Sequence, residues 1–475
     1  MTTAEDVRWR PGSPTPEGDS HTRHPAGPVW ERGSVVSAGS GLGAADVVRM
    51  LDGPAGAYVH VPFCSYICPF CPYNKVVPRG DQPQRYFAAL LGEIEAYLEA
   101  GAGGEAGFTS LYVGGGTPTL FLEDLSAVLR ALPVSGERAI EVLPTHGTPG
   151  RLQYMRDIGF TAVSIGAQSF SDEVLHRLRR PHGAAVARAA VRAALARFDL
   201  VDVDLIVDVE FDDRLAGVFL RDLEECFTLG AHQVSTYPLM RFGYTPFGRA
   251  PHHRQREHEA LAEATRIAAA HGYERRSVWT FNRRGTPTYT SITRHRFLGM
   301  GAGSSSFLGQ DFLVNHFGVQ AYVDAVSAGS IPVARWMHLG PWGGMAYDAF
   351  WQAYTGCVRP ASLAAGHRGR SLAVTAATRP LATAGLLRRS AGGYDLTPRG
   401  FDLYHDLERW VTYQMIEPLW AEMLTEHAQQ GEAGAHWASP EAGRRSWTWE
   451  LATRLFERPV DARRGYAALG GAARR

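Results

Sequence analysis

Strand-like and helix-like segments alternate six times between about residues 55 and 283. Short runs rich in Val, Ile, Tyr and Thr predict strands, and each run precedes a segment whose apolar residues recur with a helical period. The six expected strands are residues 57–63, 108–116, 139–145, 161–169, 200–209 and 232–240. Because strands that alternate with helices form parallel sheets, the expected fold class is α/β, with an open or closed barrel.

Residues suited to ligand binding stand near the ends of these expected strands. Three cysteines follow the first strand, and three glycines end the second. The third, fourth and fifth strands carry Glu141, Gln168 and Asp204. In such barrels the carboxyl ends of the strands gather the binding groups, so these residues are candidates for one site.

Cys64, Cys68 and Cys71 form a C-x3-C-x2-C motif that holds three of the chain's five cysteines. Thiolates are the usual ligands of iron–sulfur clusters. A four-iron cluster on three cysteines has one iron without a protein ligand, which can bind and activate a small molecule. The motif therefore favours an iron–sulfur cluster over a buried trio of small apolar side chains.

A zinc site is the main competing interpretation of the three thiols. Structural zinc sites are four-coordinate and usually pair two C-x2-C elements, so zinc would need a further ligand such as His60. Neither Cys226, within an expected helix, nor Cys357, which is isolated, supplies a second element.

Composition limits the class of protein. Lys plus Arg and Asp plus Glu are both 48, and this zero net charge argues against a general nucleic-acid or anionic-membrane binder. No uncharged apolar run of membrane-spanning length occurs, so no transmembrane helix is expected. Residues 1–30 are polar and proline-rich without an apolar signal region, and are expected to be a disordered tail. Five cysteines in 475 residues favour a reducing cytoplasm.

Several motifs, in this order and spacing, resemble the radical S-adenosylmethionine (SAM) superfamily, and within it the branch of the oxygen-independent coproporphyrinogen III oxidase. They are YVHVPFC, VGGGTPT, IEVLP, GAQSFSDEVLHRLRRPH, VDVDLI, VSTYPL and FLGMGAGSSS. The resemblance covers about residues 55–310 and, more weakly, 380–411. It implies a partial (β/α)6 TIM-like barrel with a mostly helical, winged-helix-like C-terminal domain.

The resemblance also implies a domain organisation. Residues 381–411 read as a helix, a short hairpin and a helix, and residues 296–309 as a Gly/Ser-rich piece. A winged helix can bind DNA, but the neutral charge and the family favour a lid over the substrate. The expected divisions are an extended or disordered tail (1–50), a radical SAM barrel (51–310) and a C-terminal lid domain (311–475).

The resemblance implies a [4Fe–4S] cluster on Cys64, Cys68 and Cys71. In that family the amino and carboxylate groups of SAM chelate the open iron. An electron from the cluster then cleaves SAM to methionine and a 5′-deoxyadenosyl radical.

Four further residues are expected at this first SAM. Gly115 belongs to a glycine run whose backbone can approach a ligand closely because it lacks Cβ atoms. Glu141 is expected to face the cationic groups of SAM as an acceptor. Tyr58 and Phe70 are expected to pack the adenosine. The plainer alternatives are a glycine turn, a solvated glutamate and core aromatic rings.

The oxidase branch binds a second SAM, and the resemblance assigns further contacts to it. Arg180 offers a planar fork for a carboxylate, although an ordinary surface arginine is the alternative. Asp204 is expected to accept hydrogen bonds from ribose hydroxyls. The residues carried over are Gly116, Thr117, Gln168, Arg180, Asp204 and Pro238, and Ser305 belongs to the same expected cofactor set.

Two departures from the oxidase put porphyrinogen decarboxylation in doubt. Pro72-Tyr73 stand where the oxidase has Gly-Cys, and the expected substrate side carries Asp208 and Glu210. The preferred hypothesis is therefore a class C methyltransferase or cyclopropanase, which uses the second SAM as carbon donor to an sp2 carbon of a natural-product intermediate. The alternatives are an oxidase-type decarboxylase and a haem-chaperone-like protein.

The expected partners follow from this interpretation. They are a small-molecule substrate, large or planar, and an electron donor of the flavodoxin or ferredoxin type. We expect a monomer in the cytoplasm, without nucleic-acid or membrane partners.

Overall fold

The computed structural model describes residues 35–37, 41–51, 53–207, 217–249, 254–287, 296–367 and 371–429. Every structural statement below refers to these residues. The expected N-terminal tail at residues 1–30 lies outside them, as do Asp208 and Glu210.

Thirteen strands form one sheet, in the order β1-β13-β12-β11-β10-β2-β3-β4-β5-β6-β7-β9-β8. The strands are β1 (Val35–Ser37), β2 (Gly56–Val61), β3 (Leu111–Gly115), β4 (Arg138–Val142), β5 (Ala162–Gln168), β6 (Leu200–Val207), β7 (Gln233–Pro238), β8 (Tyr273–Arg275), β9 (Thr280–Arg283), β10 (Phe297–Met300), β11 (Ser305–Phe307), β12 (Asp311–Asn315) and β13 (Val333–His338).

The parallel centre of this sheet contains all six expected strands, β2 to β7, in sequence order. The α/β prediction is therefore confirmed. The Gly/Ser-rich piece at 296–309 contains one more parallel strand, β10, which pairs with β2 from Phe297–Gly56 onward. Glycine is a poor strand former, and the pairing of Gly299 with Tyr58 of β2 overrides that preference here.

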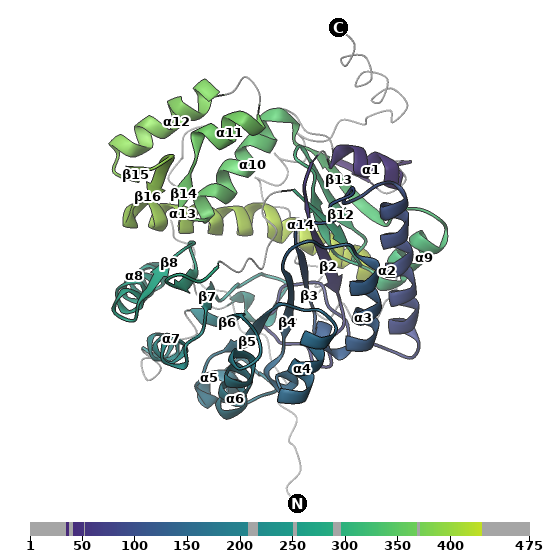
Figure 1. Cartoon of the computed structure of the whole chain (residues 1–475), viewed down its shortest axis with the longest axis horizontal. Helices are drawn as coiled ribbons and strands as arrows, with labels where there is room; N and C mark the ends of the chain where they lie inside the picture. Colours follow the sequence, from purple (N-terminus) through teal and green to yellow (C-terminus); the bar gives the residue numbers. More distant parts are fainter. Residues whose placement is uncertain are drawn as a thin grey trace, which may run out of the picture. The chain divides into compact units, whose positions relative to one another are not determined.

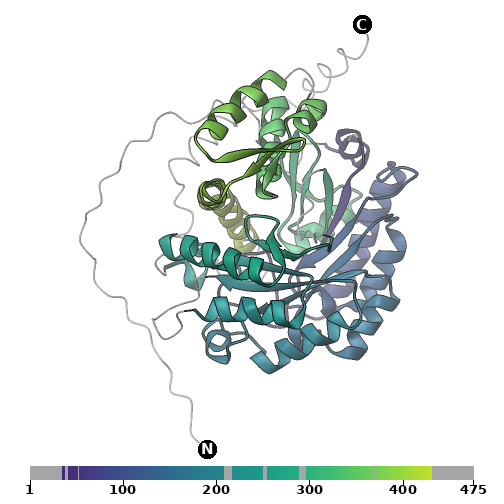
Figure 2. The ribbon, with the colours of Figure 1, turned by 60° about the vertical axis from the view of Figure 1, so that its left-hand side comes forward.

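Helices follow the parallel strands and lie around the outer side of the sheet (Figures 1 and 2). The helices up to β8 are α1 (Ala44–Met50), α2 (Gln82–Glu99), α3 (Leu122–Ala131), α4 (Pro149–Asp157), α5 (Asp172–Arg177), α6 (Ala184–Leu195), α7 (Val218–Leu229) and α8 (Arg254–Ala270), with short 3-10 turns η1 (Pro118–Leu120), η2 (Pro144–His146) and η4 (Pro246–Arg249).

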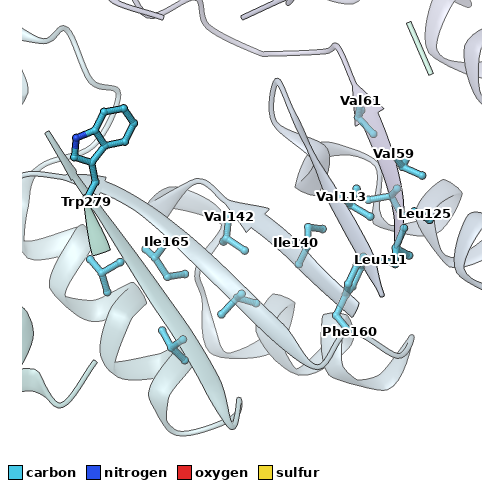
Figure 3. Close-up of a cluster of buried hydrophobic side chains, with 14 of the residues drawn as sticks. Val59, Val61, Leu111, Val113, Leu125, Ile140, Val142, Phe160, Ile165 and Trp279 are labelled. Atoms are coloured by element: carbon cyan, nitrogen blue, oxygen red, sulfur yellow. The ribbon is translucent and has the colours of Figure 1, made fainter. Parts of the chain in front are cut away.

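Alternate residues of each central strand face these helices and form the main core. Val59, Val113, Ile140 and Val163 are fully buried on neighbouring strands, and Figure 3 shows the first three of them. Burial of such a side chain contributes roughly 1.5–3 kcal/mol to stability. Since side chains alternate along a strand, the residues between them face the interior of the barrel.

The C-terminal region contains a second sheet, in the order β14-β16-β15. Its elements and the remaining helices are α9 (Val319–Ser327), α10 (Gly340–Tyr354), β14 (Cys357–Val358), α11 (Pro360–Gly366), α12 (Ser371–Thr383), β15 (Leu387–Ser390), β16 (Gly393–Leu396), α13 (Pro398–Val411), the π-helical turn η5 (Thr412–Ile416) and α14 (Glu417–Gln429). Of the predicted helix–hairpin–helix at residues 381–411, the hairpin is present as β15 and β16 and the second helix as α13, whereas the first helix, α12, ends at Thr383 and lies mostly before residue 381. Thr397 caps α13 by accepting a hydrogen bond from the Gly400 amide at 3.1 Å.

Helix α13 crosses beneath the small C-terminal sheet in Figure 1, and α13 and α14 each contact a loop next to a strand of the main sheet. The indole of Trp279 donates to Nδ1 of His405 on α13 at 3.0 Å, and the Gly243 amide donates to Glu417 on α14. The main sheet continues past residue 310 through β12 and β13. The division of the chain at residues 50 and 310 stays a prediction.

Candidate functional site

The three cysteines of the C-x3-C-x2-C motif lie on a loop directly after β2. The Cys64 amide donates to the Val76 carbonyl at 2.9 Å, and the Val76 amide donates to the Pro62 carbonyl at 2.7 Å, so both ends of the loop are tied together. Within the loop the Cys71 amide donates to the Cys68 carbonyl at 3.2 Å. All three thiols are free, with Cys64 buried and the other two partly buried.

The thiols share one electrostatic environment. Burial is the main reason that the pKa of Cys64 is raised to about 12; the Thr117 hydrogen bond opposes this shift, and the charges of Cys71 and Cys68 add to it. Burial also raises the pKa of Cys68, which Arg180 opposes. Among the described residues no group of three or more His, Cys, Asp or Glu side chains is placed to hold a single metal ion. A four-iron cluster takes one thiolate on each of three irons, so its ligands do not converge on one point.

Both ring nitrogens of His60 have other partners in the structure, so this side chain is not placed as a fourth zinc ligand. Its Nδ1 lies 2.8 Å from the Tyr58 hydroxyl, and its Nε2 lies 3.1 Å from the Asn74 carbonyl oxygen. Burial lowers the pKa of His60 to about 4, so the ring is neutral and both nitrogens are already engaged. The donor set therefore fits a three-cysteine cluster better than a zinc site.

The glycine run at the end of β3 lies directly against the cysteine loop. The Gly116 amide donates to the Val61 carbonyl at 2.7 Å, and the Thr117 amide donates to the Phe63 carbonyl at 2.7 Å. A Cβ atom on Gly116 would lie 2.5 Å from the Phe63 oxygen and 3.0 Å from the Cys64 sulfur. Glycine is required here because of this close approach between backbone segments.

Glu141 faces the same region from β4. Its Oε1 accepts from the Tyr112 hydroxyl at 2.7 Å, and its Oε2 accepts from the Gly115 amide at 3.2 Å. Burial raises the pKa of Glu141 to about 7, and the two hydrogen bonds oppose that shift. The carboxylate is thus oriented at the carboxyl end of β4, where the sequence pattern predicted a binding group.

Two side chains bring positive charge to the cysteine loop. Arg180 donates from Nη1 to the Cys68 sulfur at 3.2 Å and from Nη2 to the Gly166 carbonyl at 2.9 Å. Lys75 donates from Nζ to the Cys71 carbonyl at 2.6 Å. Lys75 is buried, and the sequence analysis did not single it out.

Asp204 lies inside the barrel on β6 and accepts from the Ser164 hydroxyl at 2.7 Å. Asp202, two residues earlier on the same face, accepts from the Ser235 hydroxyl at 2.7 Å. Burial and then the charge of Asp202 raise the pKa of Asp204 well above its usual range. Glu141 raises this pKa as well, and Arg180 lowers it, so Asp204 shares its surroundings with both.

Gln168 ends β5 in a left-handed conformation, with φ at 68°. The pairing of β5 with β6 shifts register between Ile165 and Gln168, which marks a bulge there. A non-glycine residue in this conformation stores strain, and such residues are concentrated at functional sites.

The structure distributes the remaining predicted residues more widely. Tyr58 stacks near Tyr112, with ring centroids 6.1 Å apart, whereas Phe70 packs against a different apolar cluster that includes Leu178 and Ile206. Pro238 ends β7 beside Val207, and Ser305 lies on β11, two strands away from β2 in the sheet.

Sequence reasoning missed Asp202, Lys75 and Glu408. Asp202 was recoverable, because residues two apart on a strand share a face. Glu408, on α13, is buried and accepts from the Thr412 hydroxyl at 3.0 Å. Desolvation of the Tyr73 hydroxyl raises the pKa of this residue of the cysteine loop, and the charges of Cys71, Glu141, Asp204 and Glu408 add smaller increases. No pattern in the sequence joins a residue of this helix to that loop.

Comparison with known proteins is consistent with this geometry. Residues 58–219 match the family model "Radical SAM superfamily". The chain is 30% identical to "Heme chaperone HemW" of Mycobacterium tuberculosis, over 60% of this chain and 78% of the relative. The chain belongs to the radical SAM superfamily, in its HemN/HemW-like group.

Two further comparisons agree with that membership. This radical SAM chain is 26% identical to the oxygen-independent coproporphyrinogen III oxidase of Pseudomonas aeruginosa, over 61% of this chain and 69% of the relative. Its fold matches the crystal structure of coproporphyrinogen III oxidase (HemN) from Escherichia coli with a TM-score of 0.65, over 76% of this chain and 92% of that one. Identity in the structural match is 21%, so it shows the fold alone.

Membership fixes the cofactor classes. Radical SAM proteins use a [4Fe–4S] cluster and SAM, and the three free thiols beside a close-packed glycine run fit that pair. Among the described residues, no helix combines the length and the apolar character that a membrane crossing requires.

Proposed function

We propose that this radical SAM enzyme holds its cluster on Cys64, Cys68 and Cys71 and binds a tetrapyrrole near the cysteine loop. The observation that carries the first part is the convergence of that loop with the Gly116 backbone at the end of β3. When bound, the cluster supplies the electron that cleaves SAM to methionine and a 5′-deoxyadenosyl radical.

The chain's own residues would bind and orient SAM. Glu141, held by Tyr112 and the Gly115 amide, presents a carboxylate to a cationic ligand. The left-handed Gly115, with φ at 116°, turns its backbone amide toward that carboxylate. These groups are already in place without a ligand, which reduces the entropy lost on binding.

The tetrapyrrole is supported by the relatives and by one aromatic surface. The names of the relatives specify haem and coproporphyrinogen III, which are both tetrapyrroles. Tyr73, in the cysteine loop, is 50% exposed and lies 5.7 Å from Trp420 of α14, ring centroid to centroid. Because Pro72-Tyr73 replace the Gly-Cys of the oxidase, we favour haem binding of the chaperone type over decarboxylation.

The test is anaerobic reconstitution with iron and sulfide, followed by two assays. Dithionite and SAM should give 5′-deoxyadenosine, and haem should bind with a shifted Soret band that weakens in Tyr73→Ala. Consumption of coproporphyrinogen III with release of carbon dioxide would instead identify an oxidase. Absence of both haem binding and coproporphyrinogen turnover would refute the tetrapyrrole proposal.

A second candidate function is transfer of a methyl or methylene carbon from a second SAM to an sp2 carbon. The hydrogen-bonded Asp204 inside the barrel and the strained Gln168 favour a further polar ligand there. With SAM labelled as CD3 at its methyl group, this function predicts deuterium in 5′-deoxyadenosine. Unlabelled 5′-deoxyadenosine in the presence of the true substrate would exclude it.

A further inference from the structure

Two of the three cysteine sulfurs accept a hydrogen bond from a side chain outside the loop. Thr117, in the turn after β3, donates from its hydroxyl to the Cys64 sulfur at 3.5 Å. Arg180, which follows α5, donates from Nη1 to the Cys68 sulfur at 3.2 Å. Both residues were predicted from the family resemblance to contact a second SAM, and the structure places both against the thiols.

The guanidinium of Arg180 donates hydrogen bonds to two different segments of the chain. Its Nη2 donates to the Gly166 carbonyl at 2.9 Å, which holds the group between β5 and the cysteine loop. Its Nε is buried and has no hydrogen-bond partner in the described part of the chain. The two hydrogen bonds use two of the five N–H donors of the guanidinium, so the contact with Cys68 does not depend on releasing Gly166.

Hydrogen bonds and charges at the sulfurs change how easily a cluster is reduced. Reduction adds one negative charge to the cluster and its thiolates. Donors to the sulfurs and nearby positive charges stabilise the more negative state and so raise the reduction potential. Cys64 is buried and Cys68 is partly buried, so the surroundings screen this effect less than water would. Lys75, at 2.6 Å from the Cys71 carbonyl, adds a further positive charge behind the loop.

We propose that Arg180 and Thr117 set the reduction potential of the cluster through their hydrogen bonds to Cys68 and Cys64. This inference rests on the proposed assignment of the cluster to the three cysteines. It gives both residues a positioning and electrostatic role that acts through the thiolates.

The test is a redox titration of the anaerobically reconstituted protein, followed by the electron paramagnetic resonance signal of the reduced cluster. The midpoint potential should become more negative in Arg180→Gln and in Thr117→Val, and less so in Arg180→Lys, which keeps the charge. Arg179→Gln is the matched control, since Arg179 is the exposed neighbour, and it should titrate like wild type. If Arg180→Gln takes up no cluster, the midpoint potentials of Thr117→Val and Arg180→Lys are compared with wild type instead.

The same samples separate this inference from its competitors. Equilibrium dialysis with labelled SAM counts the SAM bound to each variant. An unchanged midpoint in fully loaded Arg180→Gln, with one SAM fewer than wild type, would overturn the inference and return Arg180 to a second SAM. An unchanged midpoint in all the loaded variants would also overturn it. A wild-type protein that takes up no cluster would refute the proposed function as well, and is recognised by its iron content.

Discussion

The hydroxyl of Tyr112 on β3 donates a hydrogen bond to Oε1 of Glu141 on β4, at 2.7 Å. The pair spans two adjacent parallel strands and orients the carboxylate before any ligand arrives. We therefore expect Glu141→Gln to weaken SAM binding by about 10- to 100-fold, since a hydrogen bond to a charged group contributes about 1.5–3 kcal/mol. Equilibrium dialysis measures this. Glu137→Gln, just before the opposite end of β4, is the control and should bind SAM normally.

The raised pKa of Glu141 gives SAM binding a pH dependence with a definite sign. Burial raises this pKa to about 7, so the carboxylate that attracts a cation is lost as the pH falls through 7. Wild-type affinity for SAM should decline from pH 8 to pH 6 by roughly tenfold more than the affinity of Glu141→Gln does. Parallel pH profiles in the two proteins would show that Glu141 does not face the cation.

The amount of cluster bound should distinguish variants of the three loop cysteines from variants of Cys226 and Cys357. Alanine at position 64, 68 or 71 should remove most of the iron and sulfide after anaerobic reconstitution, because a ligand is lost. Cys226→Ala is the control, since Cys226 is fully buried on α7. Iron analysis and the cluster absorbance at about 400 nm measure how much [4Fe–4S] cluster each variant holds. Retention of the full cluster in Cys68→Ala would contradict the ligand assignment.

Gly116 tests the close approach of β3 to the cysteine loop. A Cβ atom there would lie 2.5 Å from the Phe63 oxygen, so Gly116→Ala should shift the loop and destabilise the fold by about 1–3 kcal/mol. Cluster loading should fall in the same variant. Gly150→Ala is the matched control, because nothing lies within 4 Å of its added methyl group. Equal unfolding midpoints for the two variants would count against the contact.

The buried Glu93 should make the free energy of unfolding depend on pH. It accepts hydrogen bonds from the Gly301 amide, the Asn315 amide group and the Tyr322 hydroxyl, and burial raises its pKa to about 7. A carboxyl group whose pKa is higher in the folded than in the unfolded protein stabilises the folded state at low pH, where it is protonated. Its contribution, of the order of 3 kcal/mol, is lost as the pH rises from about 4.5 to 7.

Urea unfolding of the reduced, metal-free protein at pH 5 and pH 7 measures the effect. Glu93→Gln should be less stable than wild type at pH 5, and its stability should change less between the two pH values. A pH dependence equal to that of wild type would assign the titration to other buried carboxyl groups.

The alternation of strands and helices was enough to predict the parallel centre of the sheet. It also predicted that Glu141 and Gln168 stand late in their strands, because both facts depend on local periodicity. The strand β10 was missed, since its Gly/Ser-rich surroundings read as a loop and only its pairing with β2 makes it a strand.

The hydrogen-bond partners of the site residues could not be predicted from the periodicity of the sequence. Arg180 and Cys68 lie 112 positions apart, and their contact depends on how the segment after α5 folds back over the barrel. Likewise Thr117 was predicted as a ligand contact and donates to a thiol. Family resemblance named Arg180, Thr117 and Cys68 as site residues, but it did not predict that the first two donate hydrogen bonds to cysteine sulfurs.

The contact between Tyr73 and Trp420 has a consequence for how the protein is made. A nascent chain that has emerged only to residue 400 already contains the barrel and all three cysteines, yet it lacks the helix that carries Trp420. The Tyr244 hydroxyl, which donates to the Pro72 carbonyl at 3.0 Å, can already hold the loop at that stage, but the Trp420 ring cannot yet pack on Tyr73. A cluster inserted at that stage would lie on a loop that still lacks its contact with α14, so we expect stable insertion only after α14 has been made.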